Sequence, residues 1–195
     1  MSNKYDILNK YRKNRPADLS FDMPDLDSFE ATVYDDPIKA FISMSGNVGS
    51  EVIELKDGDN IDTVIKSAYP EAKIFASNLP EIGIAQLNPD TVPEAKDLNG
   101  TDVGIVRGMV GVAENGCIWI PQTMKERAIC FISEYLVILL DRKNIVNNMH
   151  EAYSRITMTD YGYGAFISGP SKTADIAQAL VMGAQAARGV KVILM

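Results

Sequence analysis

Helix and strand patterns alternate along the 195-residue chain between residues 37 and 76. Pro37 occupies a position that suits the first residue of a helix, and Asp59 or Asn60 can cap a second helix. Strands that alternate with helices are typical of a parallel sheet covered by helices, so we predict an α/β fold. The elements predicted here are a helix at 37–46, a strand at 51–55, a helix at 61–68 and a strand at 73–76.

Short β-rich segments separated by glycines follow, with Glu114, Asn115 and Gly116 between two of them. Asn-Gly readily adopts positive φ at both central positions of a turn, so we predict an antiparallel hairpin inserted into the α/β chain. Residues 135–140 are the most hydrophobic segment and are predicted to form a central strand. The other predicted elements are strands at 102–107, 111–113, 117–120, 165–167 and 190–194, a helical turn after Pro93, a short helix at 123–131, and a helix from 143 or 144 to 156 with Ile145, Val146, Met149 and Tyr153 toward the core.

The first 35 residues differ from the rest of the chain. Residues 3–13 can form a short helix with an apolar face, whereas 15–34 contains prolines and dispersed charges without a periodic face. We therefore predict an N-terminal helix and extended arm at 1–35 and one α/β domain at 36–195. Such an arm either reaches a second copy of the chain, as in a homodimer, or is a loose terminus.

Charge and hydropathy restrict the partners and the location. The net charge of −7 and the pI of about 4.7 argue against duplex nucleic acid or an anionic membrane surface as a partner. An apolar content of 46% is that of an ordinary globular protein, and the sequence contains no apolar run as long as a membrane span. We expect a cytoplasmic protein without membrane insertion.

The cysteines and the histidine exclude several kinds of site. Cys117 and Cys130 do not form a C-x-x-C pair, and two cysteines cannot build a disulfide scaffold. An iron–sulfur cluster normally needs four thiolates, so none is expected in this chain. His150 is the only histidine, which excludes a histidine-rich zinc or iron site within one chain. No cofactor can be named from the sequence.

The stretch 164–176 has the pattern of a strand, a Gly-Pro turn and a helix that continues to about residue 187. Backbone N–H groups at such a helix start, together with nearby hydroxyls and an ammonium group, suit a phosphate or a carboxylate. Ligands in α/β sheets bind outside the carboxyl ends of the strands, and we predict this stretch to lie there. A capped βα turn without a ligand is the alternative. The predicted ligand-binding residues of this stretch are Ser168, Gly169, Ser171, Lys172, Thr173 and Asp175.

Two motifs in the second half of the chain belong together. Residues 112–117 read Val-Ala-Glu-Asn-Gly-Cys, and residues 167–176 read Ile-Ser-Gly-Pro-Ser-Lys-Thr-Ala-Asp-Ile. The first resembles the Ala-Glu-Thr-Gly-Thr hairpin of the lactate utilization (LUD) domain family, and the second closely resembles its C-terminal Gly-Pro-Ser-x-Thr-Ala-Asp-Ile motif. Arg127, ahead of the predicted strand at 135–140, also has a counterpart in that family. The relatives suggested are lactate utilization protein C and the YkgG-like proteins.

This resemblance implies a fold and a pathway. The fold is a three-layer α/β/α sandwich of the NagB/RpiA/CoA-transferase-like type, related to Rossmann architecture. The pathway is the oxidation of L-lactate to pyruvate in the bacterial cytoplasm, beside two partner proteins that carry iron–sulfur clusters. The chain departs from the family at 183–189, where Gly-Val-His-Gly-Pro is usual, and at 133–135, where proline and histidine are common. We therefore expect a divergent member.

Glu114 and Arg127 complete the candidate site. Glu114 is either a general base or a nucleophile, as in the related CoA-transferases, or the ion-pair partner of Arg127 that fixes the hairpin. Arg127 can bind a carboxylate or phosphate in bidentate fashion. Three functions compete: an accessory component of a lactate-oxidising complex, a stand-alone enzyme acting on a phosphorylated or CoA-linked carboxylate, and a sensor of such a small anionic metabolite. Whether the chain is an enzyme stays open, and the first function is predicted.

Overall fold

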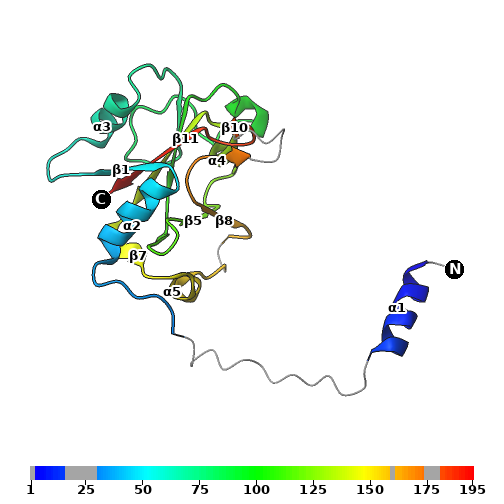
Figure 1. Ribbon diagram of the computed structural model, residues 1–195. Helices are drawn as coiled ribbons and strands as arrows, with labels where there is room; N and C mark the ends of the chain where they lie inside the picture. The colour runs from blue at the N-terminus through cyan, green and yellow to red at the C-terminus, as the bar shows by residue number, and fades with distance from the viewer. Residues whose placement is uncertain (1–2, 16–29, 159–160, 174–180) are drawn as a thin grey trace. The chain divides into compact units, whose positions relative to one another are not determined.

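The computed structural model describes residues 3–15, 30–158, 161–173 and 181–195 (Figure 1). The chain divides into two compact units, Met1–Glu30 and Ala31–Met195. The first unit contains α1 (Asn3–Asn14), which is the helix predicted at 3–13, and none of its side chains is buried. The remaining elements belong to the second unit. Among the described residues, no helix is both long and apolar enough to cross a membrane.

A five-stranded parallel sheet forms the centre of the second unit, in the order β1-β11-β6-β3-β2. The middle strand is β6, whose last five residues are buried, so the predicted central strand is confirmed. Its apolar run forms a strand because β6 is covered on both faces, as parallel strands generally are. The strands are β1 (Ser50–Glu54), β11 (Gly189–Leu194), β6 (Tyr135–Leu140), β3 (Val103–Arg107) and β2 (Phe75–Ala76).

Two helices on opposite faces of this sheet follow from local sequence signals. The helix α2 (Pro37–Asn47) begins at Pro37 and buries Phe41 in the core on one face. The helix α3 (Ile61–Ala68) is capped by Asn60, whose side chain accepts a hydrogen bond from Thr63 N, and it buries Ile65 on the other face. Both helices were predicted within one residue. Together with the sheet they form the predicted three-layer α/β sandwich.

A second, four-stranded sheet contains the predicted hairpin. Its order is β7-β4-β5-β8, and β4 pairs with β5 in antiparallel fashion. Gly116 has a φ of 66° in the turn, and Asn115 Oδ1 accepts from Cys117 N at 3.1 Å, as the Asn-Gly pattern requires. The strands are β7 (Ile145–Val146), β4 (Val110–Val112), β5 (Ile118–Pro121) and β8 (Gly164–Ile167).

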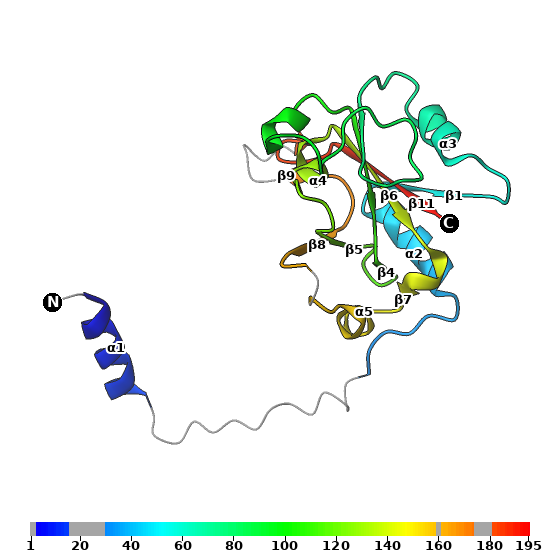
Figure 2. The same ribbon diagram turned by 180° about the vertical axis from the view of Figure 1, so that it is seen from behind.

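The predicted helix from 143 or 144 to 156 is wrong in its first part. Ile145 and Val146 form β7, because this β-branched pair completes the second sheet beside β4. The helix α5 (Met149–Arg155) begins only after Asn148, whose side chain accepts from Glu151 N. Tyr153, which was predicted to face the core, is 63% exposed. Figures 1 and 2 show the second unit from opposite sides, with α5 and β7 at its lower end and α3 at its upper end.

The short connections differ from prediction in detail. A 3₁₀ helix, Ala95–Leu98, confirms the helical turn expected after Pro93. The short helix predicted at 123–131 is shifted to α4 (Ile129–Ile132). The helix predicted from Ser171 onward is wrong at its start, because β9 (Lys172–Thr173) pairs with β10 (Val181–Met182). The prediction is also wrong at 181–187, where β10 is followed by bends and not by a helix. The stretch 174–180, which contains Asp175, lies outside the described residues.

Candidate functional site

Three of the predicted ligand residues, Gly169, Ser171 and Lys172, line one cavity of about 400 Å³. We call it the Ser171 cavity. It lies at the amino ends of β6 and β11, because Leu136 and Val190 form part of its wall. The stretch follows the carboxyl end of β8, as predicted, but the cavity does not lie at the carboxyl ends of the parallel strands, so that part of the prediction is wrong. The other lining residues are Cys130, Phe131, Phe166, Ile167, Gln185, Ala186 and Ala187.

Long-range contacts place the 168–173 segment across this end of the sheet. Gly169 has a φ of 71°, and a Cβ there would collide with Val48 O, so only glycine fits between the segment and the end of α2. Lys172 Nζ donates to the same Val48 oxygen at 2.6 Å. Ser171 N donates to Ala187 O at 2.9 Å. The chain leaving β8 is thus fixed between the start of β1 and the start of β11.

Ser168 and Thr173 contact other parts of the protein and not this cavity. Ser168 Oγ donates to Asn115 O at 3.0 Å and so joins the segment to the hairpin turn. Thr173 pairs with Val181 in the two-stranded sheet. Neither residue lines the Ser171 cavity, which leaves Gly169, Ser171 and Lys172 as the predicted residues in contact with it.

Arg127 belongs to a neighbouring cavity of about 570 Å³. Its Nη1 donates to Gln122 Oε1 at 3.3 Å, and its guanidinium carbon lies 4.5 Å from the centroid of the Tyr163 ring. Phe131, a 38% exposed residue of α4, lines both cavities. Arg127 and Ser171 therefore lie on either side of Phe131 and not in one cavity.

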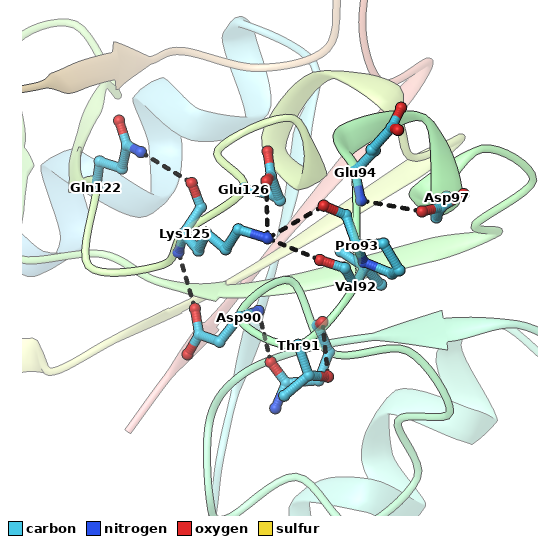
Figure 3. Close-up of polar contacts among 10 residues, drawn as sticks. Asp90, Thr91, Val92, Pro93, Glu94, Asp97, Gln122, Lys125 and Glu126 are labelled. Carbon is cyan, nitrogen blue, oxygen red and sulfur yellow. Dashed lines mark hydrogen bonds and ion pairs between the residues drawn. The ribbon is translucent and has the colours of Figure 1, made fainter.

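Lys125 holds the wall of the Arg127 cavity together (Figure 3). Its Nζ donates to the carbonyls of Val92 at 2.9 Å and Pro93 at 3.3 Å, and lies 3.5 Å from Glu126 Oε1. Its backbone N donates to Asp90 Oδ1 at 2.8 Å. Lys125 thus connects its own loop to the loop at 90–93, ahead of the 3₁₀ helix, through hydrogen bonds.

A family model described as the LUD domain matches residues 94–195, which is more than half of the chain. The matched part includes Ser171 and Arg127, after which the two cavities are named. The chain belongs to the LUD domain family. That family is associated with lactate utilization.

A solved structure agrees with the fold of this LUD domain. The crystal structure of a DUF162 family protein from Deinococcus radiodurans superposes with a TM-score of 0.64 and 14% sequence identity. The match covers 84% of this chain and 99% of that one. At this identity the likeness concerns the fold alone. No curated protein matches the sequence significantly.

Glu114 of this LUD domain is held by α5 and not by Arg127. Its Oε1 accepts from Met149 N at 2.9 Å, in the first turn of the helix, and its backbone N donates to Asn147 O at 3.0 Å. Glu114 lines neither the Ser171 cavity nor the Arg127 cavity. The alternative of a Glu114–Arg127 ion pair is thus replaced by a carboxylate that binds the backbone at the start of a helix.

The two cysteines are free and buried. Burial raises the pKa of Cys117 to about 12 and that of Cys130 to about 12, so both are neutral thiols at physiological pH. A thiol in this state is a poor nucleophile and a poor metal ligand. Among residues 3–15, 30–158, 161–173 and 181–195, no cluster of His, Cys, Asp or Glu is large and close enough to hold a metal ion.

Sequence reasoning missed Phe131, Gln122 and Gln185, which line the two cavities. Phe131 carries the strongest signal, because it is a large apolar residue that stays exposed at the end of a short helix. That signal becomes visible only once the position of the helix is known. Gln122 stands in a loop whose sequence has no motif, whereas Gln185 stands in the segment 183–189, where the chain departs from the family pattern.

Proposed function

We propose that this LUD domain protein is an accessory component of L-lactate utilization and binds a small carboxylate anion in the Ser171 cavity. The observation that supports the proposal is the composition of the cavity wall, which contains Ser171 and Lys172 together with the apolar Leu136 and Val190. A carboxylate with a small apolar body needs hydrogen-bond donors at one end and apolar surface at the other. The volume of about 400 Å³ admits a lactate- or pyruvate-sized molecule.

The donors in this wall have capacity for a ligand. An ammonium group has three N–H donors, and the bond from Lys172 to Val48 uses one. Ser171 contributes a hydroxyl, and Gln185 contributes an amide. Lys172 is exposed at the mouth, which places a positive charge on a chain with a net charge of −7. The charge of Lys172 therefore attracts a small anion to this point.

The proposal assigns the electron transfer to partner proteins with iron–sulfur clusters. Oxidation of lactate releases two electrons, and a cluster is the kind of group that accepts them one at a time. A cluster normally needs four thiolates, whereas this chain has two cysteines, both buried as neutral thiols. The family resemblance leads to the same expectation, because it implies that partner proteins carry the clusters. We place the complex in the cytoplasm.

Ligand binding can be tested by thermal unfolding of the full chain with L-lactate, pyruvate or phosphate. A ligand at about 100 times its dissociation constant adds about 2.7 kcal/mol. For a domain of this size that is a rise of about 5–11 °C in Tm. We expect a rise with lactate or pyruvate that is lost in Ser171→Ala and Lys172→Met. Ser154→Ala, which removes a hydroxyl bonded to Glu151 O on α5, is the matched control and should keep the response.

The partner assignment needs a separate experiment. We expect the tagged chain, purified from its own cells grown on L-lactate, to bring down proteins with the visible absorption of iron–sulfur clusters. Growth on lactate should stop when the gene is deleted. Normal growth without the gene, and the absence of any cluster in the purified complex, would refute the accessory role.

A stand-alone enzyme or sensor is the alternative; with Glu114 as base or nucleophile, its substrate would have to bind outside the Ser171 and Arg127 cavities, because Glu114 lines neither. It would be favoured by a ligand response without a cluster-bearing partner. Glu114→Gln then separates the two forms of the alternative: an enzyme loses turnover while it keeps the ligand, whereas a sensor keeps both its ligand and its response. Because Glu114 binds Met149 N, the melting temperature of this variant must be measured alongside.

A further inference from the structure

A third cavity, of about 420 Å³, lies on the face of the parallel sheet that α3 covers. We call it the Tyr69 cavity. It opens at the amino ends of β3, β6 and β11, between Asp102, Tyr135 and Arg188. Tyr69, at the end of α3, belongs to the core cluster of that face. The Ser171 cavity is lined by Leu136 and Val190 of the opposite face, so the two cavities are separate.

Two tyrosine rings form the apolar wall of the Tyr69 cavity. The ring centroids of Tyr69 and Tyr135 are 4.9 Å apart, with an angle of 45° between the ring planes. Gly189 stands opposite Tyr135 in the pairing of β6 with β11. A Cβ at Gly189 would lie 2.8 Å from Tyr135 Cδ1, so the ring can occupy this place only beside glycine. The aromatic wall therefore depends on a specific residue choice in the neighbouring strand.

The hydroxyl of Tyr69 is an unsatisfied hydrogen-bonding group. It is buried without a hydrogen-bond partner among the described residues, in a side chain that is 8% exposed. Burial, and then the charge of Glu51, raises the pKa of the Tyr69 phenol, so the group stays protonated and able to donate. A buried polar group of this kind is normally satisfied by a partner, and a ligand in the cavity that Tyr69 lines can supply one when the ring turns toward it.

Two further donors face the same cavity. Arg188 donates from Nε to the Tyr135 hydroxyl oxygen at 2.9 Å, and its Nη2 donates to that oxygen and lies 2.8 Å from Glu134 Oε1. Since the Tyr135 oxygen acts as acceptor in these bonds, its own O–H remains to donate. Nη1 of Arg188 forms none of these bonds and is the second donor. The guanidinium carbon lies 4.8 Å from the centroid of the Tyr135 ring.

Two of the three carboxylates that line the cavity, those of Asp102 and Glu134, are engaged by neighbouring groups. Glu134 pairs with Arg188, and Glu51 pairs with Lys191. Asp102 Oδ2 accepts from two backbone N–H groups at 2.7 and 2.8 Å. Glu71, the third lining carboxylate, is exposed and forms no bond to the described residues, so the donors of the two tyrosines and Arg188 stand beside one free acceptor group. The nearby carboxylates still disfavour a ligand with two negative charges such as phosphate, so a single negative charge fits better.

We infer that the Tyr69 cavity is a second ligand site, which takes a monocarboxylate with an aromatic or planar body. The carboxylate would accept from the Tyr69 and Tyr135 hydroxyls and from Arg188, and the planar body would pack against the tyrosine rings. Aromatic groups prefer such tilted or offset contacts. The volume of about 420 Å³ admits a ring-bearing acid. This site is independent of the function proposed for the Ser171 cavity.

Three probes of related shape test the chemistry by calorimetric titration of the full chain. Benzoate carries both the ring and the carboxylate, benzyl alcohol carries the ring alone, and inorganic phosphate carries charge without a ring. We expect benzoate to bind at least tenfold more tightly than the other two. A failure of benzoate to bind at concentrations up to about 10 mM, which is about ten times a millimolar dissociation constant, would overturn the inference. Equal binding of benzyl alcohol or phosphate would overturn it as well.

Four variants locate the site. Tyr69→Phe removes one hydroxyl and should weaken benzoate about tenfold, the usual effect of one hydrogen bond to a charged group. Arg188→Lys should weaken it as well, because the planar fork of donors is lost. Tyr153→Phe, which removes an exposed hydroxyl on α5, and Ser171→Ala, in the other cavity, should leave the affinity unchanged. Unchanged affinity in Tyr69→Phe, with normal melting, or lost affinity in Ser171→Ala, would refute the assignment.

Discussion

Because the buried hydroxyl of Tyr69 has no hydrogen-bond partner among the described residues, we predict that its removal stabilises the ligand-free protein. The side chain is 8% exposed, and its hydroxyl has no partner among the described residues. A buried polar group without a partner costs about 1–3 kcal/mol. Tyr69→Phe keeps the ring, its 4.9 Å contact with Tyr135 and the Lys191 ammonium 5.4 Å from its centroid. We therefore expect Tyr69→Phe to raise the free energy of unfolding by about 1 kcal/mol, the low end of that range.

Equilibrium unfolding in urea, followed by circular dichroism, measures this gain. A gain of about 1 kcal/mol corresponds to a rise of about 2–4 °C in Tm. Tyr153→Phe is the control, and its hydroxyl belongs to a side chain that is 63% exposed, so little change is expected. The raised pKa adds a second signature. Above the ordinary pKa of 10.0 the Tyr69 phenol ionises in the unfolded chain while it stays protonated in the folded protein, so the wild type loses stability as the pH rises. The advantage of Tyr69→Phe over the wild type should therefore grow at alkaline pH.

The result that refutes this reasoning is a loss of stability in Tyr69→Phe of 1 kcal/mol or more, on the order of a satisfied hydrogen bond. Such a loss would mean that the hydroxyl is bonded in the free protein, for example to an ordered water, and that the cavity offers a ligand one donor fewer. The combination expected here is unusual for a core variant, because the free protein becomes more stable while benzoate binding becomes weaker.

Three further predictions follow from other parts of the structure. Gly164→Ala would place a methyl group within the Trp119 indole and should cost about 1–3 kcal/mol in urea unfolding; a midpoint like the wild type would contradict this. Cys117 and Cys130, with pKa values raised by burial to about 12, should react with a thiol reagent at pH 8 only as fast as the protein unfolds, and their contribution to stability should be lost as pH rises from 9.0 toward 12. Backbone hydrogen bonds lower the pKa of Asp102, so Asp102→Asn should shift the urea midpoint down at pH 7 and have less effect below pH 3.8; an equal effect at both values would contradict it.

Elements with local start signals were predictable from the sequence. Pro37 and Asn60 mark the starts of α2 and α3, and both helices begin where these residues place them. The hairpin turn at Gly116 was equally predictable, because its positive φ is a property of the dipeptide in the turn. The sheet followed from the alternation of elements. In each case the signal lies within a few residues of the structure that it determines.

Elements that depend on distant partners were not predictable. The 168–173 segment has helix-start residues, yet Lys172 bonds to Val48, which is 124 residues away in sequence. Ile145 and Val146 read as one face of a helix until β4 is known to offer a free edge. The candidate site shows the same division. Gly169, Ser171 and Lys172 were found through their motif, whereas the position of Arg127 beyond Phe131 depends on tertiary packing.

The segment that leads into β11 serves two cavities at once. Ala187 and Val190 line the Ser171 cavity, and Arg188 and Lys191 line the Tyr69 cavity. Substitutions in this segment can therefore adjust one cavity while the other stays as it is. A single inserted or deleted residue would instead reverse the sides on which the following side chains emerge and damage both cavities together. Related chains that keep both cavities should vary here in composition but not in length.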